Sequence, residues 1–345
     1  MNDNSTEALR GQNRTLINRT LVRTKVLQTV FAYYQNEGEE NNENLKMLNG
    51  KANTAAAVRQ LKESYDNTYN LYLLLLDLVY ELTRYAQERI EDAEERAKIM
   101  HTDLTTNLRF VNNKFAQQLF ENKTLRTALD ERKLSWNAAH ESLAILYKQI
   151  VDSAYYTAYM NEETSSYESD KTIWKKIFSN LLAENTDLEN ALEELEIALD
   201  GRNWTTEADM VISYIVKTIK RFKEENGSEQ TLLEMFQEHY EAQFGTKLLE
   251  SVLAHSDEYE DLIVSCLKNW DRERLSYMDK MILKVALAEI TTFPDIMLQV
   301  SMNEYIDIAR EYSSDNSPMF VNGILEEAVA TLKRENKLLK AIPVE

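Results

Sequence analysis

Apolar residues recur every three or four positions along most of the chain, which is the spacing of one face of an α-helix. The first such pattern predicts a helix over residues 19–35. Its apolar stripe consists of four residues: Val22, Val26, Val30 and Tyr33. The acidic stretch NEGEENNEN follows at residues 36–44 and predicts a polar loop.

A longer helix is predicted from about residue 59 to residue 100. Its apolar positions alternate in steps of four and three, a heptad-like seam that is typical of helices packed along their length. The seam consists of eight residues: Leu61, Tyr65, Thr68, Tyr72, Leu75, Val79, Leu82 and Ala86. The charged end of this helix, ERIEDAEERAK, predicts a solvated surface.

Four more helical segments are predicted after this helix, followed by a second helical group that begins near residue 230. The four segments are residues 107–133, 136–160, 170–199 and 205–224. Small polar residues and glycine mark the breaks between them, for example at Asp200–Gly201 and Asn226–Gly227. Long helices with short breaks predict antiparallel hairpins.

Three serines in the last third of the chain are predicted to begin helices. Ser276 and Ser301 each precede an acidic residue by three positions, which is the capping-box pattern. Ser317 precedes Pro318, and proline suits the first position of a helix because its missing N–H would have no partner there. The polar loop that ends at Ser317 also suits a binding surface, and the local residues leave packing and binding both open.

Composition strengthens the helical prediction and limits the function. Only seven glycines and three prolines occur in 345 residues, so we expect an all-α protein. A net charge of −19 disfavours binding of nucleic acid or anionic membranes over most of the surface. The apolar run of residues 71–82 contains Asp77 and is too short to span a bilayer. The single cysteine, Cys266, and a polar N-terminus without an apolar segment lead us to expect a cytoplasmic protein.

Basic residues gather at the N-terminus of this acidic chain. Residues 1–25 carry five basic side chains against two acidic ones. Arg19 and Arg23 are one helical turn apart, so they share a face and could bind phosphate, or simply face solvent. The four histidines are far apart in sequence, and the sequence has no glycine-rich phosphate loop. We therefore expect no enzyme, no metal, no cofactor and no small-molecule substrate.

Two parts of the sequence resemble the NusB family of bacterial transcription antitermination factors. One part begins near residue 236 and includes Asn303-Glu304, a polar loop and then the motif Phe-Val-Asn-Gly at residues 320–323. The other part is the first helix, RTLVRTKVLQTVFAYYQ. The resemblance implies an all-helical RNA-binding bundle without enzymatic activity. It also implies that the protein is cytoplasmic. The partners that it implies are boxA-type RNA, the ribosomal protein that serves as NusE, and the RNA polymerase antitermination complex.

The resemblance implies two sets of contact residues. RNA would meet the basic N-terminal arm, the first helix and the loop before the last helix, at Arg14, Arg19, Arg23, Lys25, Asp315, Asn316, Ser317 and Phe320. In this expectation Phe320 offers its ring to an unpaired base. The NusE partner would meet the face around Phe31 and Asp279.

The resemblance also implies a division of the chain. We expect a loose basic arm over residues 1–18, the opening helix and acidic loop over residues 19–54, and a NusB-like bundle over residues 226–340. Residues 55–225 form a long helical insertion with no counterpart in compact members of the family. The alternative is a helical protein-interaction scaffold with weak or lost RNA binding, because the basic residues are sparse and Met319 stands where relatives often have a basic residue.

Overall fold

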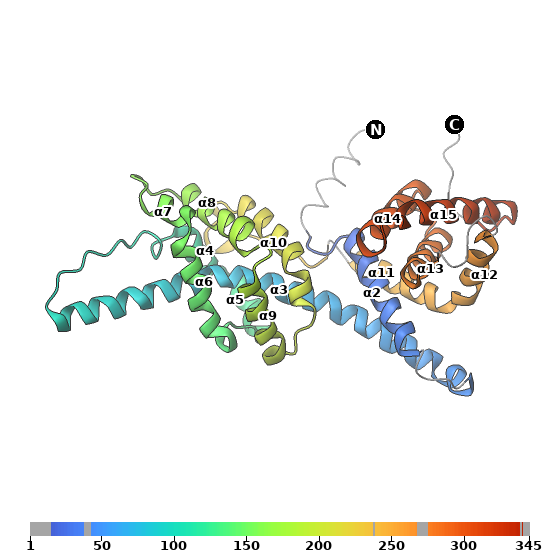
Figure 1. Cartoon of the computed structure of the whole chain (residues 1–345), viewed down its shortest axis with the longest axis horizontal. Helices are drawn as coiled ribbons and strands as arrows, with labels where there is room; N and C mark the ends of the chain where they lie inside the picture. Colours follow the sequence, from blue (N-terminus) through green and yellow to red (C-terminus); the bar gives the residue numbers. More distant parts are fainter. Residues whose placement is uncertain (1–14, 38–42, 237–238, 268–274, 339, 341–345) are drawn as a thin grey trace. The chain divides into compact units, whose positions relative to one another are not determined.

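The computed structural model describes residues 15–37, 43–236, 239–267, 275–338 and 340 (Figure 1). All regular elements in these ranges are helices, which confirms the all-α prediction. Contacts divide the chain into two compact units. Unit 1 comprises Met1–Tyr65 and Met235–Glu345, and unit 2 comprises Asp66–Glu234. No helix in the described ranges is long and apolar enough to cross a membrane.

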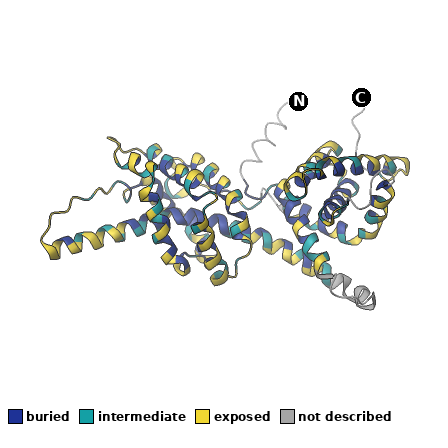
Figure 2. Ribbon diagram, viewed as in Figure 1, coloured by how far each residue is buried: buried dark blue, intermediate teal, exposed yellow. Residues whose placement is uncertain are grey.

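Unit 1 is a helical bundle built around one buried helix. Its elements are the start of α3 (Glu43–Met100) together with α2 (Arg19–Glu37), α11 (His239–Ala254), α12 (Ser256–Cys266), α13 (Tyr277–Thr292), α14 (Leu298–Tyr312) and α15 (Ser317–Arg334). Helix α13 packs against all of these except α3. Every residue from Met281 to Ile290 is buried, as the dark blue of α13 shows in Figure 2. The N-terminal α2 therefore shares a core with helices more than 200 residues away.

Gly245 on α11 marks a close approach inside unit 1. A Cβ atom there would lie 2.2 Å from Tyr65 Oη and 2.8 Å from Val22 Cγ1. We therefore expect Gly245→Ala to lower the free energy of unfolding by about 1–3 kcal/mol, despite the better helix propensity of alanine. Chemical denaturation measures this loss. In the Tyr65→Phe background the loss should shrink, because the closest atom is gone; an equal loss in both backgrounds contradicts this packing.

Unit 2 is a second helical core around the remainder of α3. Its other elements are α4 (Lys114–Glu121), α5 (Lys123–Arg132), a 3-10 turn (Asn137–Ala139), α6 (His140–Asp152), α7 (Ala154–Met160), α8 (Tyr167–Ile177), a π-helical turn (Phe178–Leu182), α9 (Thr186–Leu199), α10 (Trp204–Arg221) and a second 3-10 turn (Glu224–Glu229). Six residues of the heptad-like seam on α3, from Thr68 to Ala86, lie in this unit, and Leu61 and Tyr65 lie in unit 1. All eight are buried, which confirms the predicted packing face.

The predicted helix over residues 107–133 is wrong in its boundaries. It is two helices, α4 and α5, and each begins at an asparagine. Asn113 Oδ1 accepts a hydrogen bond from Ala116 N at 2.9 Å, and Asn122 Oδ1 accepts one from Leu125 N at 2.9 Å. Both asparagines are fully buried, and Asn122 Nδ2 also donates to Gln230 O at 2.7 Å. These caps satisfy free backbone N–H groups at both helix starts.

Candidate nucleic-acid interface

The basic residues predicted to contact RNA separate into exposed and buried members. Arg14 lies outside the described residues. Arg19 is exposed in the first turn of α2, with its Cζ 5.9 Å from the centre of the Phe244 ring. Arg23 and Lys25 are each only 2% exposed. The predicted shared basic face is therefore reduced to Arg19 in this part of α2, because neither buried side chain can reach a phosphate in this conformation.

Arg23 is held in the core of unit 1 by Glu289 on α13. Its Nε and Nη2 donate to the two carboxylate oxygens of Glu289 at 2.7 and 2.8 Å, and its Nη1 lies 3.3 Å from Glu304 Oε2. Burial alone would raise the pKa of Glu289, but the hydrogen bonds and charge of Arg23 outweigh it and hold that pKa below its usual value. A buried bidentate pair of this kind orients α2 against α13.

Two further hydroxyl groups complete the surroundings of Glu289. Ser301 Oγ donates to it at 2.7 Å and Tyr305 Oη donates at 2.9 Å. The prediction that Ser301 begins a helix is therefore wrong: α14 begins at Leu298, and Ser301 is fully buried inside it. Lys340 Nζ donates to Ser301 Oγ at 2.9 Å and to Ile296 O at 2.8 Å. Burial lowers the pKa of Lys340 to about 8.

The loop between α14 and α15 carries the other predicted RNA contacts. Asp315 and Asn316 are exposed at its tip. Ser317 is 2% exposed and Phe320 is 6% exposed, so the Phe320 ring lies in the core, where an unpaired base could not stack on it. The exposed side chain next to this tip is instead Met319, which is 69% exposed.

The predicted role of Ser317 as a helix cap is also wrong. Asn316 occupies the capping position of α15 without a side-chain cap, and Ser317 is the first helical residue. Its hydroxyl donates to Asp279 Oδ2 at 3.2 Å instead. Ser276 does cap α13 as predicted, since its Oγ accepts from Asp279 N at 3.0 Å. The Ser317 hydroxyl thus binds the buried carboxylate of Asp279 on α13 and does not cap the start of α15.

The predicted partner face contains one aromatic pair. Phe31 on α2 is half-buried, and its ring centre lies 5.3 Å from that of Tyr277, which is 43% exposed at the start of α13. Asp279 is 2% exposed and faces the loop rather than this surface. Tyr277 and Glu289 were missed as site residues, since only the fold shows that they face Phe31 and Arg23.

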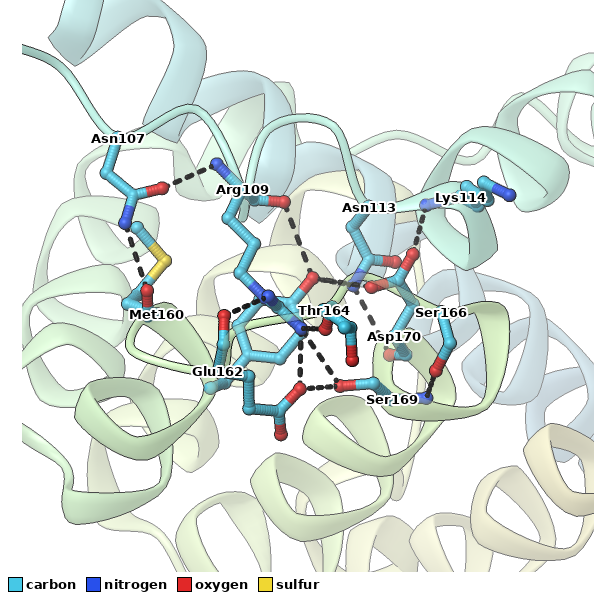
Figure 3. Close-up of polar contacts among 11 residues, drawn as sticks. Asn107, Arg109, Asn113, Lys114, Met160, Glu162, Thr164, Ser166, Ser169 and Asp170 are labelled. Carbon is cyan, nitrogen blue, oxygen red and sulfur yellow. Dashed lines mark hydrogen bonds and ion pairs between the residues drawn. The ribbon is translucent and has the colours of Figure 1, made fainter.

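Unit 2 contains a separate polar cluster that Figure 3 shows in full. Arg109 donates to Glu162 O at 2.9 Å and to Thr164 O at 2.8 Å, and its guanidinium lies 4.6 Å from the centre of the Tyr159 ring. Asp170 is fully buried and accepts from Lys114 N at 2.8 Å. These contacts fix the chain after α3 against the loop between α7 and α8.

Metal binding finds no support in the described ranges. There, no group of three or more histidine, cysteine, aspartate or glutamate side chains is placed to hold an ion. Cys266 is buried at the end of α12.

Comparison with known proteins places the similarity in the C-terminal part of the chain. The NusB family model matches residues 209–330. The transcription antitermination protein NusB of Syntrophus aciditrophicus is 38% identical over 109 residues, which cover 30% of this chain and 68% of that protein. The NusB proteins of Geobacter sulfurreducens and Geotalea daltonii are each 37% identical over 89 residues. These matches cover 26% of this chain and 64% and 61% of the two relatives.

No solved structure is significantly similar to the chain. The similarity to the Syntrophus aciditrophicus protein extends over more than two thirds of that protein. The family model covers α11 to α14 and most of α15, but not α2. The resemblance first drawn from the Asn-Glu and Phe-Val-Asn-Gly motifs is therefore confirmed, and the chain belongs to the NusB family.

Proposed function

We propose that this protein is an RNA-binding transcription antitermination factor that acts on boxA-type RNA together with NusE and the RNA polymerase antitermination complex. Its membership of the NusB family supports the proposal. The observation that carries it is the exposed Asp315–Asn316 tip directly before the helix that bears the Phe-Val-Asn-Gly motif. In this proposal RNA contacts the tip, Arg19 and the N-terminal arm that contains Arg14, and no enzymatic step is involved.

The two faces of this proposal are made by different residues of unit 1. Phe31 and Tyr277 offer aromatic surface, which suits a protein partner, and we propose them as the contact for NusE. The Asp315–Asn316 tip offers polar groups that can read the edges of unpaired bases. Titration of the full chain with boxA-type RNA and with scrambled RNA of equal length, each with and without NusE, tests the proposal.

Arg19 provides the electrostatic part of RNA binding in this proposal. Arg19→Ala should weaken binding of boxA-type and scrambled RNA by the same factor, because a phosphate contact carries no sequence information. The slope of log affinity against log salt concentration should become shallower by about one contact. Fluorescence anisotropy titrations at several salt concentrations measure this slope.

A matched control for Arg19 is Arg334→Ala in the last turn of α15. Arg334 is exposed and the variant changes the net charge equally. Its salt slope should equal that of the wild type. Equal slopes for all three proteins would remove Arg19 from the RNA contact.

A second function, a protein-interaction scaffold with weak or lost RNA binding, is favoured by one specific observation. Arg23 and Lys25 are buried, and Met319 is exposed beside the tip, so the basic surface is smaller than the sequence suggests. In this alternative NusE still binds at Phe31 and Tyr277, whereas boxA-type RNA binds no better than scrambled RNA with or without NusE. The same titrations therefore separate the two functions.

A further inference from the structure

A buried carboxylate organises the loop between α14 and α15. Asp279 Oδ1 accepts a hydrogen bond from Ser313 Oγ at 2.8 Å, and its Oδ2 accepts one from Ser317 Oγ at 3.2 Å. Ser314 Oγ lies 2.8 Å from Ser317 Oγ. Ser317 Oγ also lies 3.0 Å from Ser313 Oγ, so its one proton is shared between Ser313 and Asp279, and Ser314 is left as the donor to Ser317. We call these four residues the serine clamp.

The serine clamp binds both ends of the loop that carries the exposed Asp315–Asn316 tip. Ser313 directly follows α14 and Ser317 begins α15, so only Ser314, Asp315 and Asn316 lie between the two bonds to Asp279. The backbone inside this span is tightly turned, with Ser317 N donating to Ser314 O at 2.8 Å. Within the described residues the side chains of Asp315 and Asn316 make no hydrogen bond or ion pair. Besides these backbone bonds and the bond from Phe320 N to Asn316 O, the loop is therefore tied to α13 by the clamp.

Asp279 is suited to this role and poorly suited to direct contact. A carboxylate has two oxygen acceptors, and each takes one of the two serines that flank the loop. The side chain is 2% exposed, so neither RNA nor a protein partner reaches it in this conformation. The capping bond from Asp279 N to Ser276 Oγ fixes the carboxylate in the first turn of the buried helix α13.

We propose that Asp279 is a positioning residue for RNA binding, which acts by holding the loop of residues 313–317 in the shape that presents Asp315 and Asn316. This inference rests on the proposed function, and it replaces the predicted contact of Asp279 with NusE. The physical reason is preorganisation. A loop that is ordered before binding loses less conformational entropy on binding, and its affinity is higher.

Two substitutions of similar shape separate hydrogen bonding from packing. Asp279→Leu removes both acceptors, whereas Asp279→Asn keeps one acceptor and adds an amide donor that serine oxygens can accept. In titrations of the chain alone with boxA-type RNA, Asp279→Leu should bind at least about tenfold more weakly, and Asp279→Asn within about threefold of the wild type.

Amide hydrogen exchange provides a readout that does not depend on RNA. In Asp279→Leu the amides of Ser314–Ser317, Met319 and Phe320 should exchange faster, while those of Met281–Ile290 should keep their protection if the core is intact. Ser313→Ala, which deletes one half-buried donor, should show the same local change to a smaller extent. If Asp279→Leu does not fold, Ser313→Ala tests whether the clamp orders the loop.

The possible outcomes each decide between explanations. Unchanged RNA affinity and unchanged loop exchange in Asp279→Leu or Ser313→Ala overturn the positioning role. A loss of NusE affinity in Asp279→Leu, with RNA affinity of the chain alone unchanged, also overturns it and favours a partner contact. If the wild type does not bind RNA, the proposed function fails and with it the effect on RNA, whereas the exchange data still report whether the clamp orders the loop.

Discussion

Replacement of Arg23 by methionine should lower the free energy of unfolding of unit 1 by about 3–5 kcal/mol, the usual cost of removing one partner of a buried ion pair. The variant leaves Glu289 fully buried without its bidentate donor. Methionine fills a similar volume, so the loss reflects the unpaired charge more than a cavity. Amide exchange in α13, which lies at the centre of unit 1, measures the change separately from unit 2.

The loss should depend on pH in a defined direction. In the wild type the pKa of Glu289 is held below its ordinary value of 4.5, so its contribution to stability is present above pH 4.5 and is lost as pH falls through the lowered pKa. In Arg23→Met the guanidinium is gone and only the more distant ammonium of Lys340, bound to Ser301, opposes burial, so burial should raise that pKa. The difference in stability between the two proteins should therefore be largest near neutral pH, narrow as pH falls through the raised pKa of the variant, and be smallest below the lowered pKa of the wild type.

Arg19→Met, one turn earlier on the same helix, is the matched control. Arg19 is exposed, so this change should alter stability by less than about 0.5 kcal/mol. A similar loss for both variants, or a loss for Arg23→Met that does not vary with pH, would contradict the assignment of Arg23 to the core.

Replacement of Phe320 by alanine should cost about 3–5 kcal/mol of stability, as for other buried aromatic truncations. The ring is 6% exposed, and its neighbours Val321 and Ile324 on α15 are fully buried. RNA affinity of the folded fraction should change by less than about threefold, since a lost base stack costs about 1–3 kcal/mol, or more than fivefold. Thermal melts and RNA titrations of the same samples measure both quantities.

Met319→Ala is the control for Phe320. Met319 is adjacent and 69% exposed, so its truncation should leave stability nearly unchanged. A Phe320→Ala protein that melts like the wild type but loses more than about fivefold in RNA affinity would restore the stacking role first expected from the sequence.

Periodicity predicted that these segments are helical, because it depends on residues close in sequence, but it missed breaks inside the predicted segments 107–133, 136–160 and 170–199. The seam from Leu61 to Ala86 was predicted from its spacing alone, and all of it is buried. Helix starts were predicted less well. Ser276 caps α13 as its capping box suggests. Ser301, in a second capping box, and Ser317, which precedes Pro318, bind Glu289 and Asp279 instead. A local capping pattern cannot show that a buried carboxylate on another helix competes for the hydroxyl.

The candidate site shows the same limit. Arg19 and Arg23 share a helix face by spacing, yet only Arg19 is exposed, because the partner of Arg23 is Glu289 on a helix 266 residues away. Asp315 and Asn316 were correctly expected in a polar loop, since their neighbours Ser313, Ser314 and Pro318 are typical of turns. The clamp that holds them was not foreseeable, because it requires the first turn of α13 to lie under that loop.

The most direct test of RNA recognition by this protein is the affinity of the full chain for boxA-type RNA relative to scrambled RNA of equal length, with NusE present and at one fixed salt concentration. Base contacts from the Asp315–Asn316 tip predict tighter binding of boxA-type RNA by at least about tenfold, a discrimination of about 1.4 kcal/mol that is within the range of one or two base contacts. Replacement of both tip residues by alanine should abolish that preference while NusE remains bound. Equal affinity for the two RNAs, with NusE bound, would contradict the account and leave the protein-interaction scaffold as its function.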